Sequence, residues 1–123
     1  DITGYEYAAA LRARDGWNRI VDRVLEQVDV ILTPTTPLTA PLVEASRDML
    51  STTHHLTRFT YVFSWSVLPG PSIPCRFTSA VMPIGMLLNG RPWEETLLFQ
   101  IGHSYQSDTD WHNRRSPLLN AVG

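Results

Sequence analysis

The sequence predicts an α/β fold, and three stretches of the chain carry that prediction. Residues 4–27 repeat apolar side chains at three- and four-residue spacings, a pattern typical of one face of a long helix. Residues 28–33 and 82–88 are short and apolar, which is typical of strands buried within a sheet. A long helix followed at once by an apolar strand favours the α/β class.

The first helix has a clear start signal. Thr3 and Glu6 have the spacing of a capping box, in which each side chain bonds a backbone amide of the other residue. The expected buried face of this helix consists of Leu11, Trp17, Ile20, Val21, Val24, Leu25 and Val28.

The remaining elements follow from apolar spacing and from breakers. Pro34, Pro37 and Pro41 indicate an irregular crossing after the first strand. A helix is predicted at about 51–67, ended by the Pro-Gly-Pro at 69–71.

The second half of the chain is predicted to add a strand and a last helix. Residues 72–77 form a short extended piece, and the strand at 82–88 is closed by Asn89-Gly90, a strong turn pair. The last helix covers 93–108, with Pro92 in a position suited to a helix start.

Composition excludes several classes of function. The chain has 123 residues, 43% of them hydrophobic, with ten basic and twelve acidic residues and a net charge of -2. All ten basic residues are arginine. No basic stripe indicates a nucleic-acid partner, and no apolar run is long enough to cross a membrane. A lone Cys75 excludes an internal disulfide framework, so we expect a cytoplasmic protein.

The predicted sheet has too few strands to be stable without further strands beside it. Two or three apolar strands with three helices make a thin layer, and such strands need neighbours on both sides. The first residue is Asp1 rather than Met. We therefore expect one part of a larger sheet, cut from the middle of a longer gene product.

Four groups of residues, in order along the chain, resemble the C-terminal segment of amidase-signature proteins. The first comprises Tyr7, Ala10 and Arg14, then the stretch from Asp29 to Pro37 with Ala40 and Pro41. The second comprises Phe59, Thr60, Pro69, Ser72, Pro74 and Cys75. The third comprises Met82 to Gly85, Gly90 to Glu95, Leu97 and Leu98, and the fourth comprises Thr109, Trp111, His112 and Pro117.

This resemblance implies the last portion of a fold with a mixed central sheet sandwiched by helices. The family's chemistry is hydrolysis or transfer at an amide bond by a nucleophilic Ser, a second Ser and a Lys base. Those elements stand upstream in full-length members, and this chain contains no lysine. Arginine cannot replace the base, because its guanidinium does not release a proton near neutral pH. We therefore expect no catalytic residue in this chain.

Three positions depart from the family pattern. The family usually has glycine where this chain has Val67 and Arg76, and asparagine where it has Ser64. Glycine permits a positive φ or a close backbone approach. Bulky residues at 67 and 76 therefore put the usual shape of this loop in doubt.

Some candidate sites have plainer interpretations. Cys75 lacks any sign of an activating base and is expected to be a small, buried apolar side chain with a structural role. His54 and His55 are adjacent and therefore diverge on a helix or strand, so no metal site and no cofactor is expected. The serines Ser64, Ser66 and Ser72 are interpreted as local hydrogen bonders.

Substrate-lining residues are expected near two helix ends. Tyr61, Phe63 and Trp65 either line an apolar pocket or pack in the core, and Trp93 and Trp111 are interpreted as packing residues. Glu94 and Glu95 either contact a substrate amine or stabilise a helix start. The three residues chosen as substrate-lining are Trp65, Pro69 and Glu94.

Three hypotheses about function stay open. The favoured one is the C-terminal part of an amidase acting on small carboxamides, completing the sheet and the substrate channel of a missing N-terminal catalytic part. The second is a non-catalytic module that self-associates or binds a partner. The third is part of the A subunit of a tRNA-dependent glutamine amidotransferase. None involves binding to nucleic acid by this segment or insertion in a membrane.

Overall fold

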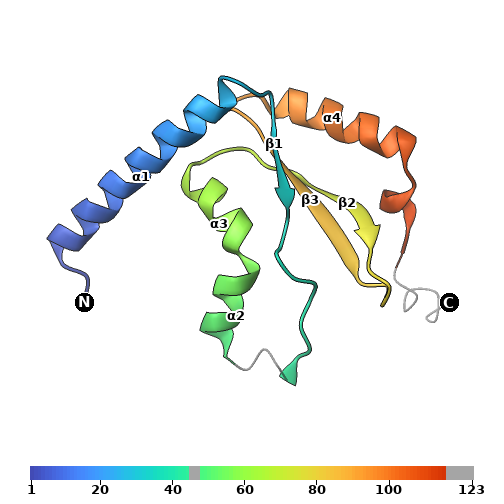
Figure 1. The fold of residues 1–123 in the computed structure, drawn as a ribbon, viewed down its shortest axis with the longest axis horizontal. Coiled ribbons are helices and arrows are strands. Elements are labelled where there is room, and N and C mark those ends of the chain that lie inside the picture. The colour runs from blue at the N-terminus through green and yellow to red at the C-terminus, as the bar shows by residue number, and fades with distance from the viewer. Residues whose placement is uncertain (45–47, 116–123) are drawn as a thin grey trace.

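The computed structural model confirms an α/β fold and describes residues 1–44 and 48–115 (Figure 1). Its elements, in chain order, are α1 (Gly4–Leu25), β1 (Ile31–Pro34), α2 (Met49–Leu56), α3 (Arg58–Trp65), β2 (Ser72–Phe77), β3 (Pro83–Asn89), α4 (Glu95–Asp108) and the short 3-10 helix η2 (Trp111–Asn113). Pro117, the end of the fourth motif, lies outside the described residues. No helix in the described ranges is long and apolar enough to cross a membrane.

The three strands form one antiparallel sheet in the order β1-β3-β2. Ile31 of β1 stands opposite Asn89, and Ser72 of β2 stands opposite Leu87 of the central strand. An irregularity between Pro74 and Arg76 shifts the β2 register, as expected for a strand that contains a proline. Over the described residues, both outer strands therefore have one edge without a neighbour, and the mixed sheet implied by the family is represented here by antiparallel pairs alone.

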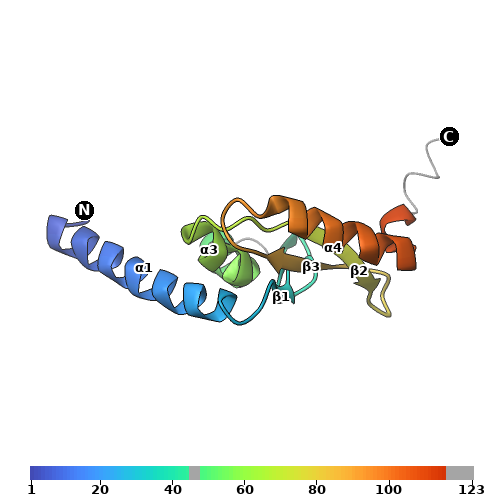
Figure 2. The same ribbon diagram turned by 90° about the horizontal axis from the view of Figure 1, so that it is seen from above.

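A small core lies between the sheet and α4, which runs along one of its faces (Figures 1 and 2). Ile73, Leu88 and Leu98 are buried at its centre. Val30, Met86, Ile101 and Tyr105 pack around them. A Cβ added at Gly102 would come within 2.9 Å of the Ile73 side chain, so the missing side chain lets α4 approach the sheet closely.

Helix α1 begins as the sequence predicts, at its end far from the sheet, and runs toward the sheet (Figures 1 and 2). Both bonds of the capping box form, with the Glu6 amide donating to Thr3 Oγ1 at 3.3 Å and the Thr3 amide donating to Glu6 at 2.8 Å. On the expected apolar face, Val21 and Leu25 are buried, but Ile20 and Val24 remain 49% and 42% exposed. The helix thus buries only its C-terminal end within the described residues.

The helix expected at 51–67 is two helices, α2 and α3, with a break at Thr57. The hydroxyl of Thr57 donates to the Thr53 carbonyl at 2.7 Å, and Thr57 has φ −92° and ψ 4°. Threonine hydroxyls that bond the carbonyl four residues earlier compete with regular helix hydrogen bonding. Helix α3 then ends at Trp65 because Val67 takes a left-handed conformation with φ 57°.

Other boundaries differ for reasons that involve distant residues. The first strand begins at Ile31 rather than at residue 28, and the Val28 carbonyl accepts a hydrogen bond from Arg91. It is also less buried than expected, since Leu32 is 61% exposed. Asn89 is the last residue of β3 rather than a turn residue, and no glycine in the described ranges has a positive φ. The last helix begins at Glu95, two residues later than expected.

Candidate functional site

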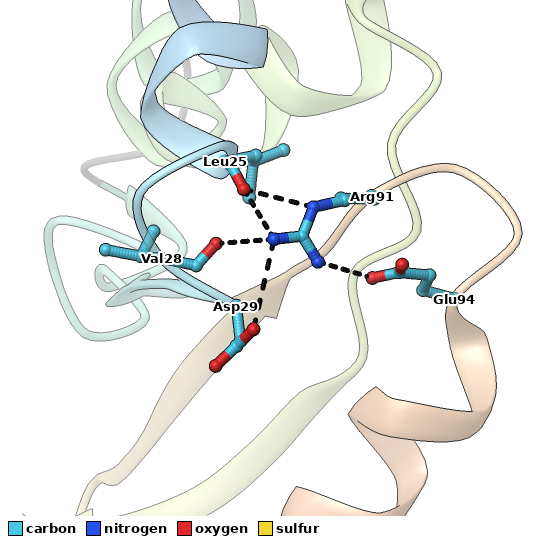
Figure 3. A network of polar contacts seen from close by, with 5 residues as sticks. All are labelled: Leu25, Val28, Asp29, Arg91 and Glu94. Carbon is cyan, nitrogen blue, oxygen red and sulfur yellow. Dashed lines mark hydrogen bonds and ion pairs between the residues drawn. The ribbon is translucent and has the colours of Figure 1, made fainter.

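Arg91 connects the end of α1 to the loop that precedes α4 (Figure 3). Its Nε and Nη2 donate to the Leu25 carbonyl at 3.0 and 2.6 Å, and Nη2 also donates to the Val28 carbonyl at 3.1 Å. The last carbonyls of a helix have no partner within the helix. The guanidinium therefore supplies donors, and a positive charge, where the C-terminal end of α1 needs both.

The same guanidinium binds two carboxylates. Arg91 Nη1 contacts Glu94 Oε2 at 2.9 Å, and Nη2 lies 3.9 Å from Asp29 Oδ1. The arginine side chain is 35% exposed, so these ion pairs are partly screened by solvent. Together the contacts fix the turn between residues 90 and 94, which carries the solvent-exposed side chain of Trp93.

Trp93 and Val67 are two strained residues at one hollow. Trp93 has φ 68° and is 92% exposed, and Val67 has φ 57° and is 78% exposed. Positive φ is unfavourable for side chains with a Cβ, above all for a β-branched valine, and such strain concentrates at functional sites. The hollow between them has a volume of about 620 Å³ and is lined by Ser64, Ser66, Val67, Leu68, Pro69, Pro92, Trp93 and Glu95. We call it the Val67–Trp93 hollow.

The three residues chosen from the sequence as substrate-lining lie apart. Pro69 lines the Val67–Trp93 hollow. Glu94 is not among the lining residues of this hollow, and its carboxylate is held by Arg91, whereas the neighbouring Glu95 does line it. Trp65 is half-buried at the end of α3 and stacks on Tyr61, with ring centroids 6.5 Å apart. The structure thus brings Pro69 close to Glu95 rather than to Glu94.

A second hollow, of about 500 Å³, lies on the face shared by α2 and α3. It is lined by Thr53, His54, Thr57, Arg58, Tyr61 and Val62. We call it the Arg58 groove. Its wall continues into the aromatic stack of Tyr61 on Trp65. No salt bridge joins Arg58 to any residue in the described ranges.

Three of the family's motif positions meet on the sheet. Thr35 Oγ1 and Ser72 Oγ lie 2.5 Å apart, one beyond the end of β1 and one on β2. A Cβ at Gly85 of the central strand would come within 2.7 Å of the first oxygen and 2.9 Å of the second. Glycine at 85 therefore leaves the space in which the two hydroxyls bond across the sheet.

Cys75 is half-buried rather than buried as expected. Of the serines, Ser66 makes the expected local hydrogen bond, whereas Ser72 bonds a residue 37 positions away. Burial raises the pKa of the Cys75 thiol, opposed by the charge of Arg76, so the thiol stays protonated and a poor nucleophile. Ser66 donates to the Val62 carbonyl at 3.2 Å, and Ser72 is paired with Thr35. Across residues 1–44 and 48–115, no group of three or more His, Cys, Asp or Glu side chains could hold a metal ion.

The sequence does not predict that Trp93 is exposed or that Val67 has a positive φ, the two features that place both residues at the hollow. It favours packing for Trp93, which is instead among the most exposed side chains of the described residues. Val67 stands out in the sequence only as a departure from the family pattern. That departure carries the signal at Val67, because glycine is favoured where the backbone needs a positive φ. The other departure, Arg76, lies in β2 and is not among the residues with positive φ.

Comparison with known proteins begins with the family model. The amidase family model matches residues 1–99, which is most of the chain. The resemblance found in the motifs is therefore supported by a match that extends across α1, the sheet and the start of α4.

Over the aligned stretches, curated relatives are between 34% and 39% identical to this chain. The A subunit of the glutamyl-tRNA(Gln) amidotransferase of Gloeothece citriformis is 36% identical over 112 residues, covering 91% of this chain and 23% of the relative. Its counterpart in Myxococcus xanthus is 37% identical over 120 residues, covering 94% and 24%. The chain thus spans about a quarter of the length of the curated relatives it matches.

Solved structures of the same family superpose on the fold. The structure of 6-aminohexanoate cyclic dimer hydrolase matches with a TM-score of 0.81 and 26% identity, covering 96% of this chain and 27% of the hydrolase. The A subunit of the glutamyl-tRNA(Gln) amidotransferase from Thermotoga maritima matches with a TM-score of 0.59 and 31% identity, covering 71% and 20%. With the family model, the relatives and the fold in agreement, this chain belongs to the amidase family.

Proposed function

We propose that this chain forms one side of an amidase that hydrolyses carboxamide bonds. It completes the central sheet and one wall of the substrate channel. The nucleophile, the second serine and the lysine base belong to another part of the enzyme, because the chain has no lysine that could serve as base. The segment alone is then inactive, and its contribution is architecture and substrate contact.

The observation that supports this proposal most directly is that the sheet of the described residues has only three strands. The described part of the chain leaves one edge of β1 and one edge of β2 without a neighbouring strand. Exposed strand edges are usually paired or covered in natural proteins. Apolar side chains on the same side of α1, Ile20 and Val24, are also half exposed. These surfaces fit the remainder of an amidase domain.

The channel wall would include the Val67–Trp93 hollow. Its lining is mainly apolar, with the hydroxyls of Ser64 and Ser66 and the carboxylate of Glu95 as polar groups. That combination is common in small-molecule sites, where a few polar groups orient a largely apolar ligand. We assign Pro69 and Trp93 to the apolar wall, and we retain Trp65 and Glu94 as flanking residues.

The partner of this segment is proposed to be the catalytic part of the same protein, or else a second copy of the chain. The curated relatives are named as subunits, which supports association with other chains in general. The small amide substrate would bind only after that association, and the cytoplasm is the compartment that fits a chain with a single cysteine.

A second candidate function is favoured by the names of the relatives. The relatives of 36% and 37% identity are A subunits of a glutamyl-tRNA(Gln) amidotransferase, whereas the structure with a TM-score of 0.81 is a hydrolase of a cyclic amide. The fold is shared by both, so the substrate distinguishes them. An amidotransferase would release ammonia from glutamine, and a small-molecule amidase would release it from simple carboxamides.

A chimera tests the proposal. This chain would replace the matching stretch of the Thermotoga maritima protein, and ammonia release would be measured with benzamide and with glutamine. We expect the folded chimera to hydrolyse at least one of them, and the identity of that substrate decides between the two functions. A matched chimera whose catalytic lysine is changed to alanine should be inactive. A folded chimera without activity, beside an active parent, would contradict the proposal.

A further inference from the structure

The Arg58 groove has the composition of a site for an anion attached to an aromatic or apolar body. Arg58, His54 and Tyr61 are among its lining residues, and their side chains carry a guanidinium, an imidazole and a phenolic hydroxyl. No acidic side chain is among the lining residues. The nearest described carboxylate along α2 is that of Asp48, which accepts from the Ser51 amide at 3.3 Å at the opposite end of that helix.

The spacing of these residues makes the groups converge. Residues three or four apart on a helix are neighbours on its surface, with Cβ atoms about 5–6 Å apart. His54, Arg58 and Tyr61 follow this spacing across the α2–α3 break, and all three line the same hollow. A planar guanidinium matches a carboxylate with two parallel hydrogen bonds, which gives the contact a defined direction.

The aromatic stack supplies the apolar half of the site. Tyr61 and Trp65 are stacked with an interplanar angle of 23°, and the tyrosine ring is shared between this stack and the groove. Tyr61 is 63% exposed, so its ring face remains accessible to a ligand. A flat group beside Tyr61 would place an attached carboxylate within reach of Arg58.

We propose that the Arg58 groove binds the carboxylate of an amide substrate, with Arg58 as the specificity-determining residue and Tyr61 as the platform for the substrate's apolar part. This inference rests on the proposed function, because it assigns the groove to the substrate channel of the assembled enzyme. It adds that the preferred substrates carry a carboxylate in addition to the amide bond that is cleaved.

Binding to the folded chimera with the Thermotoga maritima protein, with its catalytic lysine changed to alanine, tests the groove without requiring catalysis. Benzoate would be titrated into the labelled protein, and NMR shifts of His54, Arg58 and Tyr61 would be followed. Benzamide, which is neutral and of the same shape, is the matched ligand. We expect benzoate to shift these signals, and we expect Arg58→Gln to weaken benzoate binding about tenfold while leaving benzamide unchanged, since only the charge-assisted bonds are lost.

Arg12→Gln is the matched protein control. Arg12 is an exposed arginine of α1 and does not line the groove. Benzoate binding should be the same in this variant as in the chimera without it. Equal affinity for benzoate and benzamide, or an equal loss in the Arg12 and Arg58 variants, would overturn the proposal.

The chimera with the Thermotoga maritima protein separates this inference from the proposed function. In an active chimera, Arg58→Gln should raise the KM for a carboxylate-bearing amide about tenfold and leave the KM for benzamide unchanged, because only the first substrate loses a charge-assisted contact. An active chimera whose two substrates respond equally to Arg58→Gln would refute the groove assignment and leave the amidase function intact. If the chimera bound benzoate in the groove but hydrolysed no amide, the proposed amidase function would be refuted and the groove assignment would stand.

Discussion

The guanidinium of Arg91 donates two hydrogen bonds to the carbonyl of Leu25, a residue 66 positions earlier in the chain. This contact joins the end of the first helix to the turn before the last one, and it replaces the intrahelical bonds that the last carbonyls of α1 lack. The same guanidinium also forms an ion pair with Glu94. The relationship gives a structural role to the arginine of the Gly-Arg-Pro-Trp motif.

Replacing Arg91 by glutamine should destabilise the protein. The variant loses the bonds to the Leu25 and Val28 carbonyls and the pair with Glu94. Hydrogen bonds that involve a charged group contribute about 1.5–3 kcal/mol each, less at a partly exposed site, so we expect a loss of about 2 kcal/mol in the free energy of unfolding.

Urea unfolding followed by circular dichroism measures this loss. Arg114→Gln is the matched control. Arg114 lies 4.2 Å from the centroid of the Trp111 ring, a cation–π contact of about 0.5–1 kcal/mol, and pairs with Asp110 at 3.2 Å in an exposed i,i+4 arrangement. Such surface pairs contribute about 0.3–0.5 kcal/mol. If both variants lost stability equally, the capping role of Arg91 would be wrong.

Val67→Gly should stabilise the fold. Glycine adopts a positive φ without steric conflict, whereas a valine in this region costs on the order of 1–3 kcal/mol. Part of the gain is offset by the greater freedom of glycine in the unfolded chain. We expect a net gain of about 1 kcal/mol, seen as a higher midpoint of thermal unfolding.

Val43→Gly is the control for Val67→Gly. Val43 is 85% exposed and is not among the residues with positive φ, so the substitution adds only unfolded-state entropy and should destabilise slightly. Val81, with φ 61°, should respond to glycine as Val67 does. A gain at Val43 as large as at Val67 would show that backbone strain is not the cause.

Gly85→Ala should disrupt the hydroxyl pair on the sheet. The added Cβ would lie 2.7 Å from Thr35 Oγ1 and 2.9 Å from Ser72 Oγ, closer than such atoms approach in proteins. The two strands must shift, and we expect a loss of about 1–3 kcal/mol in the free energy of unfolding. Gly16→Ala in α1 is the opposite case, since its Cβ meets only Arg19 Nη2 at 3.9 Å. It should stabilise by about 0.5–1 kcal/mol. A neutral Gly85→Ala would contradict the close packing.

Acid should weaken the start of α1 through Glu6. Hydrogen bonds from the Thr3 backbone and side chain lower the pKa of Glu6 below its usual value of 4.5. A carboxylate with a lowered folded-state pKa stabilises the fold above its unfolded pKa, and that contribution is lost as the pH falls through the folded value. NMR titration of the Glu6 carboxyl carbon should give a midpoint below 4.5, and the Thr3 amide should shift with it. In Glu6→Gln that shift should disappear. A Glu6 midpoint above 4.5 would refute the capping box in solution.

The local features of the fold could be predicted from the sequence, and the long-range ones could not. The capping box of Thr3 and Glu6, the extended piece at 72–77 and the last helix are encoded by neighbours in the chain. The break at Thr57 depends on whether a hydroxyl bonds a carbonyl, and the late start of β1 accompanies a contact from Arg91. Spacing in the sequence contains no information on such contacts.

The candidate site shows the same division. Pro69, chosen because a proline-glycine break marks a loop beside an apolar helix, lies at the Val67–Trp93 hollow, and its contact with a substrate stays a prediction. The choice of Glu95 over Glu94 could not be made, because it depends on which carboxylate Arg91 holds. Trp93 resembles a packing residue in the sequence, and only its left-handed backbone, with φ 68°, turns the side chain into solvent.

An unfinished sheet should also be visible in the size of the particle in solution. The free edges of β1 and β2 in the described part of the chain favour pairing with other strands. We expect the purified chain to self-associate, as measured by light scattering, with an unfolding midpoint that depends on protein concentration. A cooperative melt at the mass of one chain, 13.9 kDa, would show that the segment is an independent domain.

Ammonia release from benzamide by the purified chain, measured beside the chimera under the same conditions, tests the central claim most directly. We expect the isolated chain to release no more ammonia than buffer alone, because it lacks a lysine base, and we expect the chimera to restore hydrolysis of a carboxamide. Sustained turnover by the isolated chain, unaffected by further purification, would contradict the claim that the catalytic residues belong to another part of the enzyme.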